Sequence, residues 1–183
     1  MTYPFLLGDW SRRISTVSDA AQVWFDRGLN WTYGYNQEEA VACFRSALEC
    51  DPNCAMAWWG VAYAAGPFYN RPWIRYSQTE IAATLPECHA ATTKAMGLAL
   101  TCTEPEAALI RALVCRYQSP EECDATVLMQ WQFEYADAMR SVAARFDDDP
   151  DIAALYVEAA VTCTPRQLWD LPTGSPFRLS RGQ

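Results

Sequence analysis

Thiols and an imidazole are the side chains of this sequence best suited to metal binding or nucleophilic catalysis. Cys50 and Cys54, with three residues between them, have the spacing closest to that of a zinc site. Structural zinc takes four nitrogen or sulfur ligands in a tetrahedron, and the only histidine, His89, has just Cys88 beside it. Adjacent residues of a helix point about 100° apart, so this pair does not form a nucleophile and base by itself. We therefore predict no metal site, no cofactor and no catalytic residue.

Several cysteines sit among apolar residues at helical spacing. Cys43, Cys50, Cys115 and Cys163 are of this kind, and a free thiol in such a place behaves as a small hydrophobic side chain. This pattern predicts reduced thiols and a reducing compartment. The even total of eight cysteines keeps a disulfide framework as the alternative.

Charge and hydropathy narrow the classes of partner. The net charge is −8, whereas nucleic acids and anionic membranes attract basic surfaces. We therefore expect neither of them, and a protein or peptide with a basic or neutral surface instead. No signal peptide is visible, and the most apolar window, residues 55–66, is about half as long as a membrane span, so a cytoplasmic location is expected. The acidic residues 147–151 lack calcium-loop spacing and fit the junction of two helices.

Helices are expected to position all of these residues, because no segment alternates apolar and polar residues as a half-buried strand does. Pairs of a short polar residue and an acidic residue three positions later mark the starts of helices. The predicted helices cover residues 37–50, 53–65, 84–100, 103–117 and 149–164. Ser77 with Glu80 predicts a short helical turn, and Ser119 with Glu122 precedes a long helix that ends near Phe146. Pro86 would lie in the first turn after Thr84 and Glu87, and residues 66–76 would form a loop.

A repeat with a period of 34 residues joins the helices before residue 66. Its first copy combines aromatic and small residues at fixed spacing: Trp24, Gly28, Trp31, Ala40, Phe44, Ala47 and Pro52. Trp58 follows Trp24 after 34 residues, and Ala62 then takes the place of Gly28. Small residues let two helices approach closely while aromatic rings fill the space beside them. This is the tetratricopeptide repeat (TPR) pattern, apart from Arg27. The alternative is an ordinary helical hairpin that matches by chance.

The sequence also resembles one group of large, mostly bacterial TPR-domain proteins whose function is not established. The runs WFDRGL at residues 24–29, DPNCAMAWWG at 51–60 and YADAMR at 135–140 carry the resemblance, which extends over about residues 20 to 171. It implies an α-α superhelix that binds partners on the concave face, lined by the first helix of each repeat. Members of this group continue with further repeats, so the resemblance also implies that the chain is truncated at its C-terminal end.

The expected architecture is all-α, a TPR-like superhelix of about three helical hairpins plus one unpaired helix. Residues 18–164 would form the domain, with the clearest repeat at 21–54 and a second one starting at 55. Residues 1–17 would be an N-terminal extension, and residues 165–183 a flexible tail. The last helix would lack a hairpin partner for its apolar Ile152, Leu155, Tyr156 and Ala159, which favours self-association through this helix.

One stripe of the first helices is the predicted binding surface. It consists of Gln22, Phe25, Leu29, Tyr33, Trp59 and Tyr63. Exposed aromatic residues of this kind are typical of interaction sites, although the stripe lacks the lysine and asparagine of a clamp for peptide carboxylates. We predict a non-enzymatic scaffold that binds a peptide or helical segment of another protein on this stripe.

Three alternatives stay open for the same residues. The stripe is plain core, covered by the loop of residues 66–76 or by a neighbouring helix. Or the chain is the N-terminal fragment of a larger enzyme or small-molecule-binding protein, in which case a pocket between that loop and the Trp59 face would favour binding of a small molecule even here. Or it is a truncated product without a function of its own.

Overall fold

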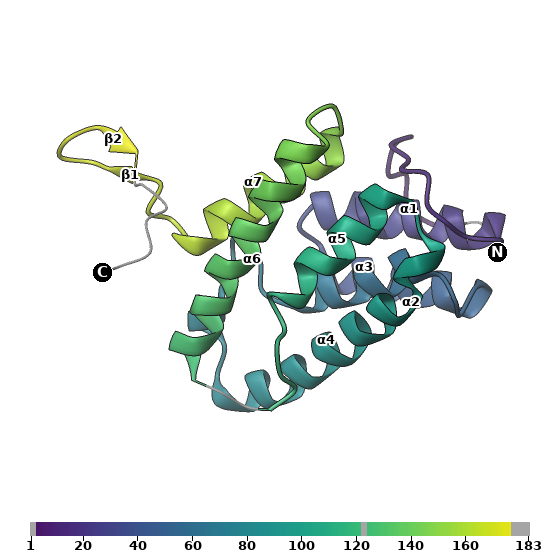
Figure 1. Ribbon diagram of the computed structural model, residues 1–183, viewed down its shortest axis with the longest axis horizontal. Helices are drawn as coiled ribbons and strands as arrows, with labels where there is room; N and C mark the ends of the chain where they lie inside the picture. Colours follow the sequence, from purple (N-terminus) through teal and green to yellow (C-terminus); the bar gives the residue numbers. More distant parts are fainter. Residues whose placement is uncertain (1–2, 122–123, 177–183) are drawn as a thin grey trace.

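The computed structural model describes residues 3–121 and 124–176, and helices dominate this part of the chain (Figure 1). The α-helices of the described residues are α1 (Asp19–Tyr33), α2 (Gln37–Cys50), α3 (Ala55–Ala65), α4 (Gln78–Leu98), α5 (Glu104–Val114), α6 (Ala125–Arg145) and α7 (Pro150–Cys163). Two short 3-10 turns, η1 (Trp73–Arg75) and η2 (Ala99–Thr101), flank α4. The strands β1 (Trp169–Asp170) and β2 (Ser175–Pro176) form a small antiparallel hairpin after α7. The all-α prediction is thus confirmed.

Local capping explains why several predicted boundaries are confirmed. The Asn36 side chain accepts a hydrogen bond from the Glu39 N–H at the start of α2, and Asp149 accepts one from the Ile152 N–H at the start of α7. A capping box of Thr103 and Glu106 opens α5. These side chains satisfy backbone donors that the first helical turn leaves free.

The prediction of a separate helix from Thr84 is wrong. Helix α4 runs without interruption from Gln78 to Leu98, so Pro86 lies inside it, and its start is the capping box of Ser77 and Glu80. Proline removes one backbone hydrogen bond from a helix interior. Here the buried face continues on both sides of the proline, with Ile81, Leu85, Cys88, Ala91, Thr92 and Ala95, and this tertiary packing holds the helix together. For α6 the N-cap is Asp124, and the predicted cap partner Glu122 lies outside the described residues.

Helices α1, α2 and α3 meet around a single ring, that of Phe44. A Cβ atom added to Gly28 of α1 would lie 2.6 Å from the Phe44 Cε1 atom, and one added to Gly60 of α3 would lie 2.5 Å from its Cδ1 atom. Phe44 is fully buried and packs against Phe25 with the ring centroids 5.4 Å apart. The predicted role of Gly28 as a small-residue crossing is therefore confirmed, and Gly60 is the residue that forms the equivalent contact on α3.

The other repeat residues divide into buried small residues and partly buried aromatics. Ala40, Ala47 and Ala62 are fully buried between helices. Trp24, Trp31 and Trp58 are only partly buried and pack against the edge of the core. Pro52 lies between α2 and α3, where its carbonyl accepts a hydrogen bond from the Trp58 indole. Tyr3 contacts the ring of Trp24 edge-on, and Phe5 that of Trp31, so the N-terminal residues complete this edge.

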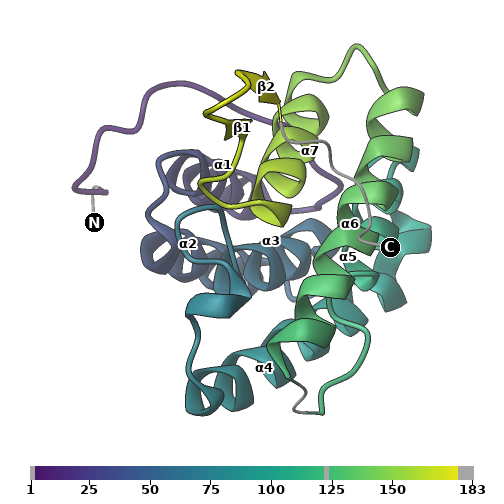
Figure 2. The same ribbon diagram turned by 90° about the vertical axis from the view of Figure 1, so that its left-hand side faces the viewer.

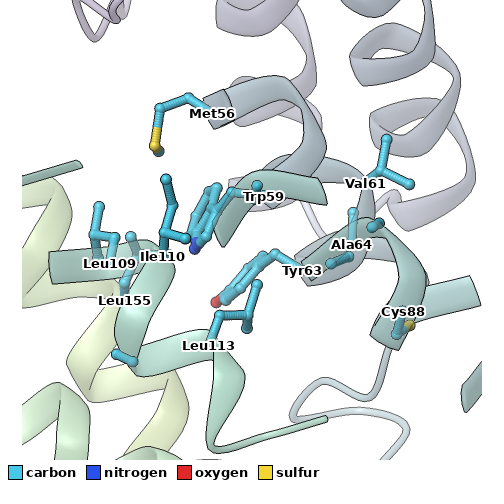
Figure 3. Packing of buried hydrophobic residues seen from close by; sticks show 14 of the residues in the cluster. Met56, Trp59, Val61, Tyr63, Ala64, Cys88, Leu109, Ile110, Leu113 and Leu155 are labelled. Carbon is cyan, nitrogen blue, oxygen red and sulfur yellow. The ribbon is translucent and has the colours of Figure 1, made fainter. Parts of the chain in front are cut away.

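Helix α7 is the last helix of the described residues and has no second helix of a hairpin after it, yet its apolar side is covered. It packs against α6, and it lies across the molecule from the α4 end of the fold (Figures 1 and 2). Ile152, Leu155 and Ala159 are buried, so the prediction that they lack a partner is wrong, and only Tyr156 stays partly exposed. The reason is tertiary: α7 lies beside α1 and α3, where Leu155 and Glu158 line a small cavity together with Tyr33 and Tyr63. Figure 3 shows Leu155 in the same apolar region as Ile110. None of the helices in the described ranges is long and apolar enough to cross a membrane.

Replacing Gly60 with alanine tests the packing around Phe44. The new methyl group would overlap a fully buried ring, and overpacking of this kind costs about 1–3 kcal/mol. We expect Gly60→Ala to lower the free energy of unfolding in urea by an amount in this range. Gly97→Ala in α4 is the matched control, because nothing lies within 4 Å of its added Cβ atom, and it should leave stability equal or slightly raised. An unchanged Gly60→Ala protein would contradict the tight crossing.

Candidate functional site

The predicted binding stripe lies almost wholly inside the protein. Gln22, Phe25, Leu29, Trp59 and Tyr63 are all buried, with exposed fractions of 8% or less, whereas Tyr33 is partly exposed. The expectation of an exposed surface is therefore wrong for five of these residues, and the alternative of plain core describes them. The rings of Trp59 and Tyr63 stack with their centroids 4.9 Å apart (Figure 3).

Helix α7 supplies the polar contacts that close this face. The Tyr63 hydroxyl donates to Glu158 of α7 over 3.0 Å, and the Tyr33 hydroxyl donates to Asp151 at the start of the same helix. Burial, followed by the effect of the Glu158 charge, raises the pKa of Tyr63 well above its ordinary value. Both tyrosines therefore stay protonated and act as hydrogen-bond donors to α7 at neutral pH.

A buried arginine holds the next layer of the fold. Arg116, just after α5, is fully buried, and its Nε atom donates to Gln132 Oε1 of α6 over 2.9 Å. Its Nη2 atom donates to the Pro67 carbonyl over 2.6 Å, and its guanidinium lies 4.9 Å from the centre of the Tyr135 ring. Sequence reasoning missed this residue, because neither its neighbours nor its spacing distinguish it from a surface arginine.

The N-terminal residues 10–17, called the strap below, pass from the start of α7 to the start of α1 (Figure 2). The main chain of the strap is recognised by side chains of the helices. The Arg12 N–H donates to Asp26 over 3.1 Å, and the Ile14 N–H donates to Gln22 over 3.0 Å. The Ser15 N–H donates to Glu106 over 2.6 Å, and the Val17 N–H donates to Asp51 over 3.4 Å. The carbonyls of Trp10 and Arg12 accept from Asn30 over 2.9 Å and from Gln22 over 2.8 Å.

One side chain of the strap makes the strongest contacts. Both terminal nitrogens of Arg12 donate to the two carboxylate oxygens of Asp149, each over 2.8 Å, and Nη1 also donates to Asp151 over 3.0 Å. Paired hydrogen bonds between arginine and a carboxylate are among the strongest polar contacts in proteins. Trp10 adds a hydrogen bond from its indole to Asp151 over 2.9 Å, and the aliphatic side chain of Ile14 is 4% exposed.

Hydroxyl groups complete the binding of the strap. Ser15 Oγ donates to Glu106 and Thr16 Oγ1 donates to Asp51, both over 2.6 Å. Glu106 is 2% exposed and also accepts the two hydrogen bonds from Thr103 that cap α5. The residues that bind the strap are called the acidic groove: Gln22, Asp26, Asn30, Asp51, Glu106, Asp149 and Asp151. They come from α1, from the connection between α2 and α3, and from the first turns of α5 and α7.

The electrostatics of the acidic groove follow from these contacts. Burial acts to raise the pKa of Asp149, but the hydrogen bonds from Arg12 and from the Ile152 N–H outweigh it and lower the pKa below its ordinary value. Arg12 is the strap residue that brings a positive charge into the groove, whereas Arg13 points outward and is exposed. Of the five carboxylates of the groove, Asp149 and Asp151 pair with the guanidinium. The other three accept hydrogen bonds from N–H and hydroxyl groups of the strap. The groove therefore carries more negative than positive charge, which suits a basic ligand.

A pocket, called the loop pocket below, lies at the C-terminal end of α3. This pocket of about 770 Å³ is bounded by α2, the C-terminal end of α3 and the loop of residues 66–76, and includes Tyr35, Arg45, Phe68, Arg71 and Tyr76. It opens beside Ala64 and Ala65, away from the Trp59 face where the sequence suggested a pocket. The Gln37 Oε1 atom beside it is buried without a hydrogen-bond partner. A smaller cavity of about 130 Å³ shares Tyr35 and Gln37 with this pocket.

The cysteines are arranged as single thiols. Every cysteine in the described ranges is free, with Cys50 exposed and Cys54 buried. Burial raises the pKa of Cys88 to about 12, so this thiol is protonated at neutral pH and is not a thiolate nucleophile. Within residues 3–121 and 124–176 no group of three or more histidine, cysteine or acidic side chains is placed to hold a metal ion.

Comparison with known proteins assigns no family. No family model, curated protein or solved structure matches the chain significantly.

Replacing Arg12 with alanine tests the link between the strap and α7. The change leaves Asp149 and the 5%-exposed Asp151 without their cation, and loss of one partner of a buried ion pair costs about 3–5 kcal/mol. We expect Arg12→Ala to reduce the free energy of unfolding by about this amount at pH 7. Arg13→Ala is the matched control and should change it by less than about 0.5 kcal/mol, as exposed positions do.

The pH dependence gives a second readout of the same pair. A carboxylate whose pKa is lowered in the folded state stabilises the protein above its unfolded pKa, about 3.9 for aspartate, and loses this contribution as the pH falls through the folded value. The stability difference between wild type and Arg12→Ala should therefore be full at pH 6–7 and shrink below about pH 4. Urea unfolding across this range measures it, and a difference independent of pH would contradict the ion pair.

Proposed function

We propose that the protein is a non-enzymatic, TPR-like helical scaffold that binds an extended segment of another protein in the acidic groove. The 34-residue spacing of Trp24 and Trp58 and the crossing of α1, α2 and α3 at Gly28 and Gly60 support the TPR-like superhelix. In this superhelix α1, α3, α5 and α7 are the first helices of successive repeats. The net charge of −8 supports a basic protein segment as the partner, and a cytoplasmic location is part of the same proposal.

One observation carries this function: the groove already binds a chain segment, its own strap, through main-chain groups as well as side chains. Recognition of N–H and C=O groups depends little on sequence, so the same side chains can serve a segment of another protein. Gln22 illustrates the point, because its amide accepts from the Ile14 N–H and donates to the Arg12 carbonyl. A ligand backbone in the same position would find both partners ready.

The proposal moves the binding residues along the first helices. Of the six stripe residues, Gln22 stays in the groove, and Tyr33 supports it by donating to Asp151. Phe25, Leu29 and Trp59 become the hydrophobic floor that keeps α1 and α3 in place. The groove uses carboxylates, three of them at the starts of α5 and α7, where the stripe was expected to use aromatic rings.

Small-molecule binding in the loop pocket is the second candidate function. Its support is the unpartnered, buried Gln37 Oε1 atom beside an open pocket of about 770 Å³ that is lined by Arg45, Arg71 and aromatic rings. A buried acceptor without a partner costs free energy, and a ligand with a hydrogen-bond donor would remove that cost. The two functions use different faces and can be tested separately.

A random peptide display library tests the scaffold function. We expect Arg12→Ala, in which the strap is loosened, to enrich peptides that bind with dissociation constants of about 1–100 μM, in the range of weak protein–peptide complexes. The Arg13→Ala chain is the matched control. It should enrich fewer binding peptides than Arg12→Ala does, because its strap still occupies the groove. Enriched peptides should carry more arginine and lysine than the input library. Failure of Arg12→Ala to enrich any sequence would overturn the scaffold proposal.

The loop pocket is tested by thermal shift against a panel of small carboxylates and nucleotides. A ligand that binds only the folded chain raises the unfolding temperature, and at 100 times its dissociation constant it adds about 2.7 kcal/mol. We expect any shift to disappear in Phe68→Ala and to persist in Ile74→Ala. Ile74 is 59% exposed in the same loop and does not line the pocket. Equal loss in both variants would assign the shift to loop stability.

A further inference from the structure

The side chains of the strap are buried to different extents. Ser11 and Arg13 are exposed, Arg12 is partly buried, and Ile14 is buried. Asp151 accepts hydrogen bonds from both Trp10 and Arg12, and the buried Ile14 fills an apolar position next to them. The hydroxyl groups of Ser15 and Thr16 donate to the groove carboxylates that follow. These contacts define the positions of the strap that the groove recognises.

This inference rests on the proposed function. We propose that the strap occupies the acidic groove in the way that a segment of a partner protein would. The groove then selects basic peptides of one sequence pattern. The pattern is an aromatic residue, an arginine two positions later and an aliphatic residue two positions after that, followed by a serine or threonine. Such a segment in a partner protein would displace the strap. The free chain is therefore autoinhibited, because its own strap fills the groove.

The middle position of this pattern must be arginine rather than lysine. Asp149 and Asp151 sit together at the start of α7, and both accept from one planar guanidinium. A lysine ammonium carries one compact charge and does not bind a carboxylate through two parallel hydrogen bonds. Asp149 also caps α7 through the Ile152 N–H, which fixes its carboxylate in the position that meets the guanidinium.

The other two positions follow from shape and polarity. The indole of Trp10 needs one acceptor, Asp151, and is otherwise 47% exposed, so another aromatic residue with a polar edge would serve. Ile14 is 4% exposed and requires an aliphatic side chain of similar volume. Ser15 faces Glu106 with both its N–H and its hydroxyl, and threonine carries the same two donors.

Tethering explains how the strap can inhibit without unusual affinity. A segment joined to its site by a short connection competes at an effective concentration in the millimolar range, and only Val17 and Ser18 separate Thr16 from α1. A partner peptide must therefore bind well, or the strap must be weakened, before exchange is seen. Removing the Arg12 guanidinium weakens the strap and leaves the acidic groove itself unaltered.

The experiment measures binding of a fluorescent peptide with the sequence of residues 8–18 (GDWSRRISTVS) to the full chain by fluorescence polarisation. Arg12→Ala should bind this peptide at least about tenfold more tightly than wild type, since its groove is easier to open. A peptide carrying Arg12→Ala should bind at least about tenfold more weakly than the parent peptide, as expected for a central arginine anchor. A peptide carrying Arg13→Ala, with the same charge change, should stay within about twofold.

A substitution in the groove completes the design. Asparagine caps a helix as well as aspartate does, so Asp149→Asn in the Arg12→Ala chain keeps the cap of α7 and removes the charge. This substitution should lower the affinity for the parent peptide at least about tenfold and should leave the affinity for the peptide carrying Arg12→Ala unchanged. Circular dichroism checks that each chain is folded. If Arg12→Ala is unfolded, Trp10→Ala, which removes one hydrogen bond of the strap, takes its place.

The possible outcomes separate this inference from the proposed function. If the peptides carrying Arg12→Ala and Arg13→Ala lose the same amount of affinity, the groove recognises net charge alone, and the sequence pattern is overturned. If library peptides bind the Arg12→Ala chain but the peptide of residues 8–18 does not, the sequence pattern is overturned and the proposed scaffold function is retained. Absence of binding by both would remove both proposals. Light scattering would detect a dimer of the wild-type chain formed by exchange of straps. Such a dimer would assign the groove to a second copy of the chain and overturn the proposal of a different partner protein.

Discussion

Carboxylates placed at the starts of helices are the constraint on which the arrangement of this protein depends. Glu106 in the first turn of α5 and Asp149 at the cap of α7 satisfy the backbone donors of their own helices, and both also bind the strap. A buried carboxylate is costly unless donors or a cation compensate it. The strap supplies main-chain N–H groups, hydroxyls and the Arg12 guanidinium. Groove and strap therefore stabilise each other, and a ligand that replaced the strap would have to bring the same donors.

The hydrophobic floor beneath the groove follows from the same geometry. Because Arg12 ties the start of α7 to the strap, and Tyr33 and Tyr63 donate to α7, this helix lies against the residues that the repeat pattern would leave open. The aromatic side chains then lose their water and become core. Arg116 adds a buried charge that joins the loop of residues 66–76 to α6. The polar, acidic residues of the groove are in turn covered by the strap.

Two sites built from different residues give the two proposed functions separate physical grounds. The acidic groove combines negative charge with main-chain recognition, which suits an extended basic segment. The loop pocket combines two arginines, which pair with Glu87 and Glu80, with aromatic rings, which suits a small polar ligand. They share no residue, although the cavity next to the pocket reaches Tyr33 and Glu158, side chains that hold α7. Strap and loop pocket are thus connected through α7.

The amino-acid sequence by itself determined what depends on neighbouring residues: the all-helical class, the bounds of α2 and the start of α7, where a cap and its partner stand three residues apart, and the small residue Gly28 at a crossing. Only the tertiary structure decided the rest. It keeps α4 continuous through Pro86, because the buried face outweighs one missing hydrogen bond. It buries Trp59 and Tyr63 and makes the strap a bound segment, because Arg12 and Asp149 are 137 residues apart in sequence, and no local pattern records which distant charges meet.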